Sequence, residues 1–345
     1  MHLGYAFWGF CEEYKDSVIV ETPDGGRFTR PIFVKELFKR GIDVVCLQQK
    51  RERAPLKGLR FSNDFPKIDA LFVEWRWPTY KNYTLHPQHE NRFYEPDLDR
   101  QSALLNFYSG KIPIVVWDTD LKVRNYIIKK YGKNVIWTEP SFFCKNKGFL
   151  SMPYFTDYDL ELFKPTIPKK RVVYVGSNYE RYWAIDKYFY NIGEKYKDID
   201  IQFYGNWLNI SPERPEQAKQ IIRYSKYINF NKRNKFLDGM KIMNESICTI
   251  HLMKEEYCKY GLITPRYFES LASNCIAFIP EEFPVQLYGK KFEAKAEDIV
   301  EKIEALSKLT INQRKTVIGE QKQAAKAISP QTQVSTFVNN LWELL

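Results

Sequence analysis

The stretch Tyr174-Val-Gly-Ser-Asn-Tyr-Glu-Arg181 is the most informative part of the sequence for the fold. It begins in an apolar run that predicts a strand, turns at Gly176 and Ser177, and leads into a segment that predicts a helix. Backbone amides at such a helix start, together with Arg181, suit the binding of a diphosphate. A Gly-Ser turn can also simply connect a strand to a helix, so the rest of the chain must decide between the two interpretations.

A second segment, Gly261 to Phe283, supports the first. Its apolar pattern predicts a helix over Pro265 to Ser273, on which Arg266 and Glu269 are three residues apart and project from one face. An exposed intrahelical ion pair would explain them at a stabilisation of only a few tenths of a kcal/mol. The functional interpretation places Arg266 on a diphosphate and Glu269 on ribose hydroxyls.

Apolar runs alternate with amphipathic segments in both halves of the chain, which predicts two doubly wound α/β domains with parallel sheets. The expected boundaries are 1–165 and 170–329, because Pro165 and Pro168 form a plausible linker; a C-terminal helix over 330–345 is expected to cross back to the first domain. The expected strands are Leu3 to Phe7, Asp43 to Leu47, Ala70 to Glu74, Pro113 to Trp117, Asn134 to Thr138, Arg171 to Val175, Ile199 to Phe203, Ile247 to Met253 and Ile276 to Ile279. The expected helices include Arg30 to Arg40, Pro96 to Ser109 and Tyr182 to Tyr196.

The composition is that of a soluble globular protein. Hydrophobic residues make up 44% and charged residues 27% of the 345 residues, and no segment approaches the roughly 18 apolar residues of a membrane span. The six cysteines show no CxxC pair, which favours a reducing cytoplasm. The net charge of +10 favours a polyanionic partner such as nucleic acid or a membrane surface, although many basic proteins bind neither.

Several motifs together resemble the GT-B glycosyltransferases, and in particular the T-even phage DNA β-glucosyltransferase family. In the second half, Gly176-Ser177 follows the first strand and Phe203-Tyr-Gly-Asn206 follows the second strand, in the order and spacing of that family. In the first half, Thr119-Asp120-Leu121 is similar to the family's Thr-Asp-Ile. The donor-binding segment is matched by Arg266, Glu269, Leu271, Ala272, Ser273 and Glu281-Glu282-Phe283.

The resemblance implies two Rossmann-like domains that face a cleft, the first on the acceptor side and the second holding the nucleotide sugar. It implies an inverting transfer, with glucose from UDP-glucose as the expected donor and a hydroxymethylated pyrimidine of duplex DNA as the acceptor, as in phage DNA hypermodification. Asp120 would be the catalytic base, because an acceptor hydroxyl must lose its proton as it attacks. Asp118 would orient it. The implied donor-binding residues are Gly176, Ser177, Arg181, Gly205, Asn206, Arg266 and Glu269.

Two features depart from the family pattern. Only Arg181 lies near the Gly-Ser turn, where the family has two arginines, so Lys232, Arg233 and Lys235 are candidates for the missing charge. The family's N-terminal Glu aligns with Thr29, so that role is not carried over. The loop Phe10 to Phe28 is expected to face the substrate, although Pro23-Asp24-Gly25 alone would also be an ordinary turn.

Alternative roles exist for the carboxylates and histidines. Asp118-Thr-Asp120 also reads DxD, a pattern that can ligate a divalent metal, so a metal at this pair is an alternative to Asp120 as base. Glu74 is a further carboxylate candidate at a strand end, or an ordinary strand-end charge. No histidine pair has a convincing metal spacing; His86 and His89 lie in a Pro- and Asn-rich stretch where solvation is the expected state.

Three functions are therefore compatible with the sequence. The favoured one is a DNA glycosyltransferase, expected to be monomeric and to work in the cytoplasm, which is the host cytoplasm if the chain is viral. The second is a GT-B enzyme that acts on a cell-surface glycan, lipid or protein. The third is an inactive relative that binds nucleic acid. The basic residues between Lys219 and Lys241 could form a DNA-binding edge or a solvated surface.

Overall fold

The structure is a computed structural model that describes residues 1–7, 9–12, 25–48, 50, 55–75, 95–132, 134–178, 180–208 and 215–344. The chain divides into two compact units. Unit 1 comprises the described residues of 1–156 together with 328–344, and unit 2 comprises those of 157–327. Among the described residues, no helix combines the length and the apolar composition that crossing a membrane demands.

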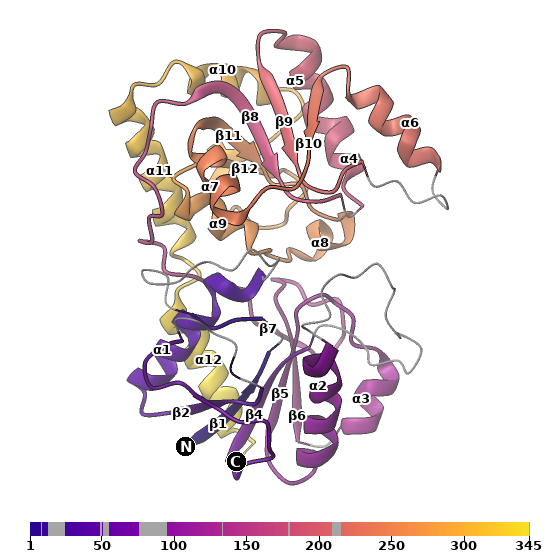
Figure 1. Cartoon of the computed structure of the whole chain (residues 1–345), viewed down its shortest axis with the longest axis vertical. Coiled ribbons are helices and arrows are strands. Elements are labelled where there is room, and N and C mark those ends of the chain that lie inside the picture. Colours follow the sequence, from indigo (N-terminus) through magenta and orange to yellow (C-terminus); the bar gives the residue numbers. More distant parts are fainter. Residues whose placement is uncertain are drawn as a thin grey trace. The chain divides into compact units, whose positions relative to one another are not determined.

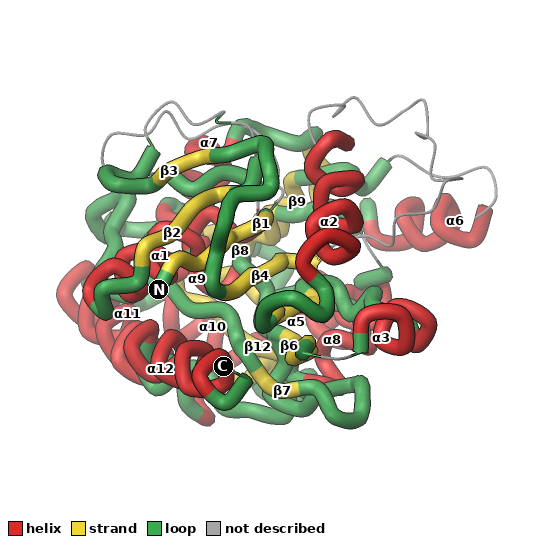
Figure 2. The backbone as a smooth tube through the Cα atoms, turned by 90° about the horizontal axis from the view of Figure 1, so that it is seen from below, coloured by secondary structure: helices red, strands yellow, loops and turns green. Residues whose placement is uncertain are grey.

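Among the described residues, unit 1 forms a seven-stranded sheet whose paired strands are all parallel. The strands are β1 (His2–Ala6), β2 (Asp43–Cys46), β3 (Arg60–Phe61), β4 (Ala70–Trp75), β5 (Ile114–Asp118), β6 (Val135–Glu139) and β7 (Leu150–Ser151). Their order is β3-β2-β1-β4-β5-β6-β7. Figure 2 shows β3, β2, β1 and β4 side by side. From β1 the strand order runs outward to β2 and β3 on one side, and from β4 outward to β7 on the other side. Ligands of such sheets bind at the carboxyl ends of the strands near the point where the order reverses, here between β1 and β4.

Helices cover both faces of this sheet (Figure 1). Leu71 and Val73 of β4 share a core with Leu104 and Ile127, which lie on the helices of one face. Phe72 points to the opposite face because side chains alternate along a strand, and it packs there against the other two helices. The helices are α2 (Glu95–Tyr108) and α3 (Asn125–Tyr131) on the first face, and α1 (Arg30–Lys39) and α12 (Pro330–Trp342) on the second; a short 3₁₀ turn, Gly25–Phe28, precedes α1.

The C-terminal helix α12 is an integral part of unit 1, as expected for a helix that crosses back to the N-terminal region. Its first turn is capped by Ser329, whose hydroxyl accepts a hydrogen bond from the Thr332 amide at 3.0 Å. Phe337 is buried, with its ring centroid 5.1 Å from that of Phe33 on α1 and 4.9 Å from that of Phe72 on β4. Aromatic packing therefore holds α12 to the sheet.

Among the described residues, unit 2 forms a six-stranded parallel sheet in the order β10-β9-β8-β11-β12-β13. Its strand order reverses between β8 and β11. The strands are β8 (Lys169–Val175), β9 (Asp200–Tyr204), β10 (Ile228–Asn231), β11 (Ser246–Ile250), β12 (Ile276–Pro280) and β13 (Glu293–Ala294). The helices are α4 (Tyr182–Ala184), α5 (Tyr190–Lys195), α6 (Pro215–Tyr224), α7 (Phe236–Asn244), α8 (Glu255–Tyr260), α9 (Arg266–Ala272), α10 (Ile299–Ser307) and α11 (Ile311–Ala325), with a 3₁₀ turn at Lys290–Phe292.

The expected fold class, two doubly wound α/β halves, is confirmed, and the ends of the expected strands differ by only a few residues. Two details differ. The polar stretch from Lys219 to Lys235 contains β10. Among the described residues this strand lies at the edge of the sheet and pairs with β9 alone, so it needs few apolar side chains. The helix expected over Tyr182 to Tyr196 is interrupted by a π-helical turn, Ile185–Phe189, between α4 and α5. His86, His89 and most of the loop 10–28 lie outside the described residues.

Replacing Phe337 by Ala is expected to destabilise unit 1 by about 3–5 kcal/mol, because the change removes a buried ring between α1 and β4 and leaves a cavity. Urea unfolding followed by circular dichroism measures the change. The matched control on the same helix is Trp342→Ala, at a side chain that is 56% exposed, which should change the free energy of unfolding by less than about 0.5 kcal/mol. Equal losses in the two variants would contradict the packing argument.

Candidate functional site

The turns after β8 and β9 touch through their backbones, and glycine makes this contact possible. The Gly176 amide donates a hydrogen bond to the Tyr204 carbonyl at 2.7 Å. A Cβ atom on Gly205 would lie 2.4 Å from the Gly176 carbonyl oxygen, and a Cβ atom on Gly176 would lie 2.8 Å from Arg266 Cζ. A side chain at Gly205 would collide with the backbone of the first turn, and one at Gly176 would displace the Arg266 guanidinium, which explains both glycines that the sequence singled out.

Ser177 and Asn206 link the same two turns. The Asn206 amide donates to Ser177 Oγ at 3.2 Å, and Trp207 Nε1 donates to the Gly176 carbonyl at 2.7 Å. We call the pairs Gly176-Ser177 and Gly205-Asn206 the donor turns, after the role that the sequence predicts for them. The structure thus brings together four of the residues predicted to bind the donor. The sequence analysis missed Trp207, although it follows Asn206 directly and its ring is buried.

Arg266, the first residue of α9, reaches the first donor turn. Its guanidinium donates to the Val175 carbonyl and, at 3.1 Å, to Glu269 Oε2. The side chains of Arg266 and Glu269 are 31% and 14% exposed, so the pair is neither fully buried nor an ordinary surface pair. The two sequence segments that were expected to cooperate therefore meet at Gly176.

Arg181 stabilises the backbone beside the first donor turn. Its side chain is buried, and its guanidinium donates to the Ser177 carbonyl and, at 2.9 Å, to the Leu252 carbonyl. Tyr174 donates to the same Leu252 carbonyl at 3.2 Å. The chain that follows β11 is thereby tied to the end of β8, at the point where the strand order reverses.

The candidates for extra positive charge follow β10. Lys232, Arg233 and Lys235 are exposed. The Gly205 amide donates to the carbonyl of Asn231 at 3.2 Å, so this basic segment begins beside the second donor turn. Its proposed role in binding phosphate stays a prediction.

His251, which directly follows β11, is a buried group that the sequence analysis did not assign. Its ring stacks on Tyr267 with centroids 4.3 Å apart, and its Nε2 lies 3.3 Å from Ser270 Oγ and 3.4 Å from the Tyr288 hydroxyl. Both hydroxyls donate their protons to the Tyr267 carbonyl, so Nε2 is the atom that donates to them. Burial, together with the nearby charge of Arg266, lowers the pKa of His251 to about 3.

In unit 1, Asp118 ends β5 and determines the course of the following turn. It is fully buried, and its two carboxylate oxygens accept hydrogen bonds from the amides of Lys122 and Val123, each at 2.7 Å. Burial raises the pKa of Asp118 to about 7, although both amide hydrogen bonds act in the opposite direction. With both oxygens engaged, Asp118 is suited to positioning the turn.

Asp120 lies in this turn and is partly exposed. The turn is held to β4 because Thr119 donates to the Trp75 carbonyl through both its amide and its hydroxyl, at 3.1 and 3.0 Å. Leu121 has a φ of 55°, a left-handed conformation that is costly for a branched side chain. Strained residues of this kind gather at functional sites, which favours Asp120 over Asp118 as the group that meets a substrate.

Glu74, the further carboxylate candidate, is enclosed by other side chains. Arg30 donates to it through Nε at 2.9 Å and through Nη2 at 2.7 Å, and the Tyr5 hydroxyl donates to it as well. The side chains of Arg30 and Glu74 are 1% and 2% exposed. This network joins α1 to β1 and β4 and leaves the Glu74 carboxylate shielded from solvent.

Among the described residues, no group of three or more His, Cys, Asp or Glu side chains is arranged to hold a metal ion. The DxD alternative, Asp118 with Asp120, offers two carboxylates, of which that of Asp118 is engaged by backbone amides. Metal binding at this pair stays a prediction.

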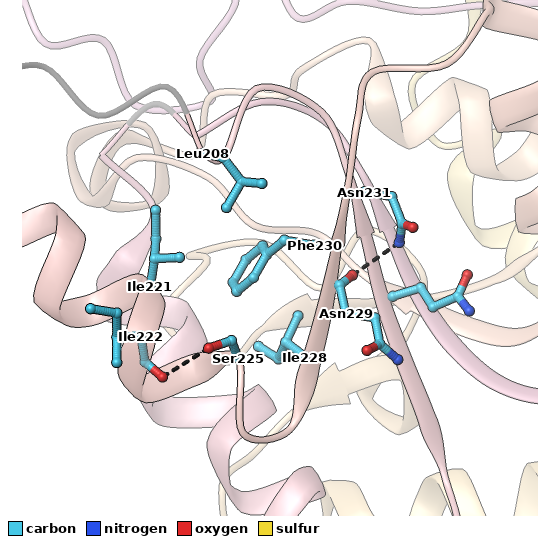
Figure 3. A pocket seen from close by; sticks show the side chains of 9 residues that line it. Leu208, Ile221, Ile222, Ser225, Ile228, Asn229, Phe230 and Asn231 are labelled. Atoms are coloured by element: carbon cyan, nitrogen blue, oxygen red, sulfur yellow. Dashed lines mark hydrogen bonds between the residues drawn. The ribbon is translucent and has the colours of Figure 1, made fainter.

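A cavity of about 530 Å³ lies in unit 2 along the edge strand β10 (Figure 3). Leu208, Ile221, Ile222 and Phe230 form its apolar wall, and Asn231 lines its polar side. None of the described residues predicted to bind the donor lines this cavity. It adjoins the second donor turn through Asn231, whose carbonyl accepts the hydrogen bond from the Gly205 amide.

The comparison with known proteins identifies the fold. No protein-family model matches the chain, and no curated protein sequence matches it. Among solved structures, the phage T4 α-glucosyltransferase in complex with UDP and a 13-mer DNA aligns with a TM-score of 0.58 at 11% identity, over 96% of this chain and 94% of that chain. The chain has the GT-B glycosyltransferase fold.

Other GT-B structures align over the whole chain. HepE from Anabaena in complex with UDP-glucose gives a TM-score of 0.53 at 10% identity, over 99% of this chain and 100% of that chain. An O-GlcNAc transferase from Thermobaculum terrenum gives 0.56 at 9% identity, over 100% of this chain and 67% of that chain. The expected resemblance to phage DNA glucosyltransferases is confirmed for the fold, and the similar enzyme has the α designation where the sequence analysis named the β family.

Replacing Gly205 by Ala is expected to destabilise unit 2 of this GT-B protein by about 1–3 kcal/mol, because a Cβ atom at 2.4 Å from the Gly176 carbonyl oxygen forces the donor turns apart. Urea unfolding measures the loss. The matched control is Gly319→Ala in α11, where a Cβ atom would meet nothing within 4 Å and where Ala should stabilise the helix slightly. If the Gly205 variant were as stable as this control, the close approach would be wrong.

The stability of the protein is expected to fall in acid through His251. The pKa of His251 is about 3 in the folded protein and about 6.5 in an unfolded chain, so the unfolded chain binds a proton first as the pH falls. The stabilisation from the neutral ring is complete above about pH 6.5 and is lost progressively toward pH 3. His251→Gln cannot titrate and should show a flatter dependence of the unfolding free energy between pH 6.5 and pH 4. Parallel pH profiles for the two proteins would contradict this assignment.

Proposed function

We propose that this GT-B protein is a glycosyltransferase that transfers a hexose from a UDP-sugar, with UDP-glucose as the favoured donor. The observation that carries the proposal is the contact between the two donor turns, with Arg266 and Glu269 beside Gly176. Solved GT-B structures of similar fold were determined with UDP or UDP-glucose, which supports a nucleotide-sugar donor here.

Unit 2 supplies the donor site in this proposal. Arg266, beside the first donor turn, stabilises the diphosphate, whose negative charge increases as it leaves. Glu269, held at 3.1 Å from Arg266, binds the ribose hydroxyls. Arg181 adds positive charge next to Ser177 while it holds the Ser177 carbonyl.

Unit 1 supplies the catalytic base. The oxygen of the acceptor hydroxyl attacks the anomeric carbon, the bond from that carbon to the diphosphate oxygen breaks, and UDP leaves with the bonding electrons. Asp120 accepts the hydroxyl proton during the attack. Asp118 positions Asp120 by holding the turn through the amides of Lys122 and Val123. A single displacement of this kind inverts the anomeric configuration.

The favoured acceptor is a hydroxymethylated pyrimidine in duplex DNA. The net charge of +10 suits a polyanion, and the similar α-glucosyltransferase structures contain DNA, in one case with an HMU base. The alternative is a glycan, lipid or protein acceptor, which the similarity to an O-GlcNAc transferase supports. Fold alone does not select between these acceptors.

The Asp120→Asn variant should transfer sugar about 10²- to 10⁴-fold more slowly, because it loses the general base while the donor site is unchanged. The assay follows radiolabelled glucose from UDP-glucose to duplexes that contain cytosine, thymine, 5-hydroxymethylcytosine or 5-hydroxymethyluracil. The matched control is Asp64→Asn, at an exposed aspartate of unit 1, which should retain the wild-type rate.

Label on the hydroxymethylated duplexes alone would support the DNA acceptor, and NMR of the digested product would report whether the linkage is inverted. UDP-glucose hydrolysis without labelled DNA would direct the search to glycan, lipid or protein acceptors. Full activity of Asp120→Asn would refute its role as base, and the absence of both hydrolysis and transfer would favour a nucleic-acid-binding protein without activity.

A further inference from the structure

The loops that follow β5 and β6 in unit 1 carry a marked excess of positive charge. Residues 121–150 contain seven Lys and Arg side chains and a single acidic side chain, that of Glu139. Glu139 is fully buried, so it does not offset the charge of the surface. Among the described residues, the exposed charge of these loops is therefore positive apart from Asp120, which precedes Lys122 and is partly exposed.

The sheet brings the two loops to one place. β5 and β6 are neighbouring parallel strands, with Trp117 paired to Thr138, so their carboxyl ends lie one strand spacing apart, about 4.8 Å. Asp118 and Glu139 are the last residues of these strands. Both loops therefore leave the sheet from adjacent positions on the same edge.

The buried carboxylates turn each loop so that its basic side chains face solvent. Asp118 accepts the amide of Lys122, and Glu139 accepts the amide of Lys145 at 2.7 Å and that of Asn146 at 3.1 Å. Both lysine side chains are exposed, and so are those of Arg124 and Lys147. We call Lys122, Arg124, Lys145 and Lys147 the basic face.

Two large aromatic side chains on the same loops are also exposed. Phe143 is 56% exposed and lies between β6 and Lys145, and Tyr126 is 46% exposed and lies in the first turn of α3. Exposed aromatic rings among cations are typical of surfaces that bind nucleic acid, where they contact sugars and bases. Solvation of a charged surface alone does not explain these exposed aromatic rings.

We propose that the basic face binds the phosphate backbone of the duplex that carries the acceptor base. The proposal rests on DNA being the acceptor. Lys122 is two residues from Asp120, and the same carboxylate of Asp118 holds the turn that carries both. Phosphate contacts determine the position and orientation of a protein on a duplex. Contacts made by the basic face therefore position the DNA relative to the proposed catalytic base, Asp120.

The basic stretch of unit 2 is less suited to this role. Arg223 lies 3.2 Å from Asp186, and Lys226 lies 3.9 Å from Glu194, so carboxylates offset part of its charge. The loops of unit 1 contain no exposed carboxylate from residue 121 to residue 150 among the described residues. The DNA-binding edge considered for Lys219 to Lys241 is accordingly better placed on unit 1.

The test compares two variants that lose the same charge. The first replaces Lys122, Arg124, Lys145 and Lys147 by Gln. The control replaces four exposed lysines of unit 2 by Gln: Lys195, Lys197, Lys290 and Lys315. Fluorescence anisotropy measures the Kd for a duplex containing 5-hydroxymethyluracil between 50 and 200 mM salt, and calorimetry measures the Kd for UDP.

Each lost phosphate contact should reduce the slope of log K against log salt by about 0.9, so the basic-face variant should lose roughly two to four units of slope and at least about tenfold in affinity at 100 mM salt. The control should retain the wild-type slope, and both variants should bind UDP as the wild type does. If the fourfold variant melts at a lower temperature than the wild type, Lys122→Gln with Lys147→Gln provides the same comparison with two charges.

The outcomes separate this inference from the proposed function. Equal weakening of DNA binding in the two variants, or none in either, would overturn the basic face and leave the DNA acceptor intact. Wild-type protein that binds UDP and does not bind the duplex at 50 mM salt would overturn the DNA acceptor itself, and the basic face with it.

Discussion

Unit 1 depends on how three buried carboxylates are neutralised at one edge of its sheet. The neighbouring strands β4, β5 and β6 carry Glu74, Asp118 and Glu139 at or next to their carboxyl ends, and each side chain is almost fully buried. A buried charge costs several kcal/mol unless it is paired or hydrogen-bonded. Glu74 is satisfied by Arg30 and Tyr5, whereas the other two are satisfied mainly by backbone amides. These partners determine the paths of the chain segments around the edge.

In unit 2, glycine shapes the corresponding edge of the sheet. Gly176 and Gly205 follow the strands β8 and β9, and their missing side chains let two turns touch through their backbones. Larger groups then pack around the contact: Trp207 donates to the Gly176 carbonyl, and Arg266 lies against Gly176. The result places the partly exposed Arg266 guanidinium beside the two turns, and a guanidinium suits the charge of a diphosphate.

Sequence reasoning recovered the elements that a local pattern determines. The β-branched strands, the helix α9 and both glycine turns were predicted because apolar periodicity and glycine signal them within a few residues. The strand β10 was missed, because an edge strand with one neighbour keeps polar residues such as Asn229 and Asn231. The π-helical turn within Tyr182–Lys195 was missed as well, because no local residue pattern announces it.

At the candidate site, too, only the contacts that a local sequence motif encodes could be predicted. The sequence predicted that Arg266 and the Gly-Ser turn would meet, since a motif carried both. It left Glu74 undecided, because its partner Arg30 is 44 residues away, and it did not assign His251, whose environment is built by side chains from α9 and from Tyr288. Interactions between distant residues, and those between a side chain and a backbone amide, leave no mark in the local pattern.

The pair Asp118 and Asp120 illustrates what the structure adds to a motif. In the sequence, the family resemblance implies that Asp120 is the base and that Asp118 orients it, while the DxD pattern leaves a metal at the pair as an alternative. In the fold, both carboxylate oxygens of Asp118 accept hydrogen bonds from the amides of Lys122 and Val123. Asp120 is partly exposed on a turn that also contains the strained Leu121. A carboxylate engaged by its own backbone serves best as a support, and its partly exposed neighbour Asp120 is the one placed to meet an acceptor hydroxyl. The same support displays Lys122, so a single buried charge links the proposed base to the proposed DNA surface.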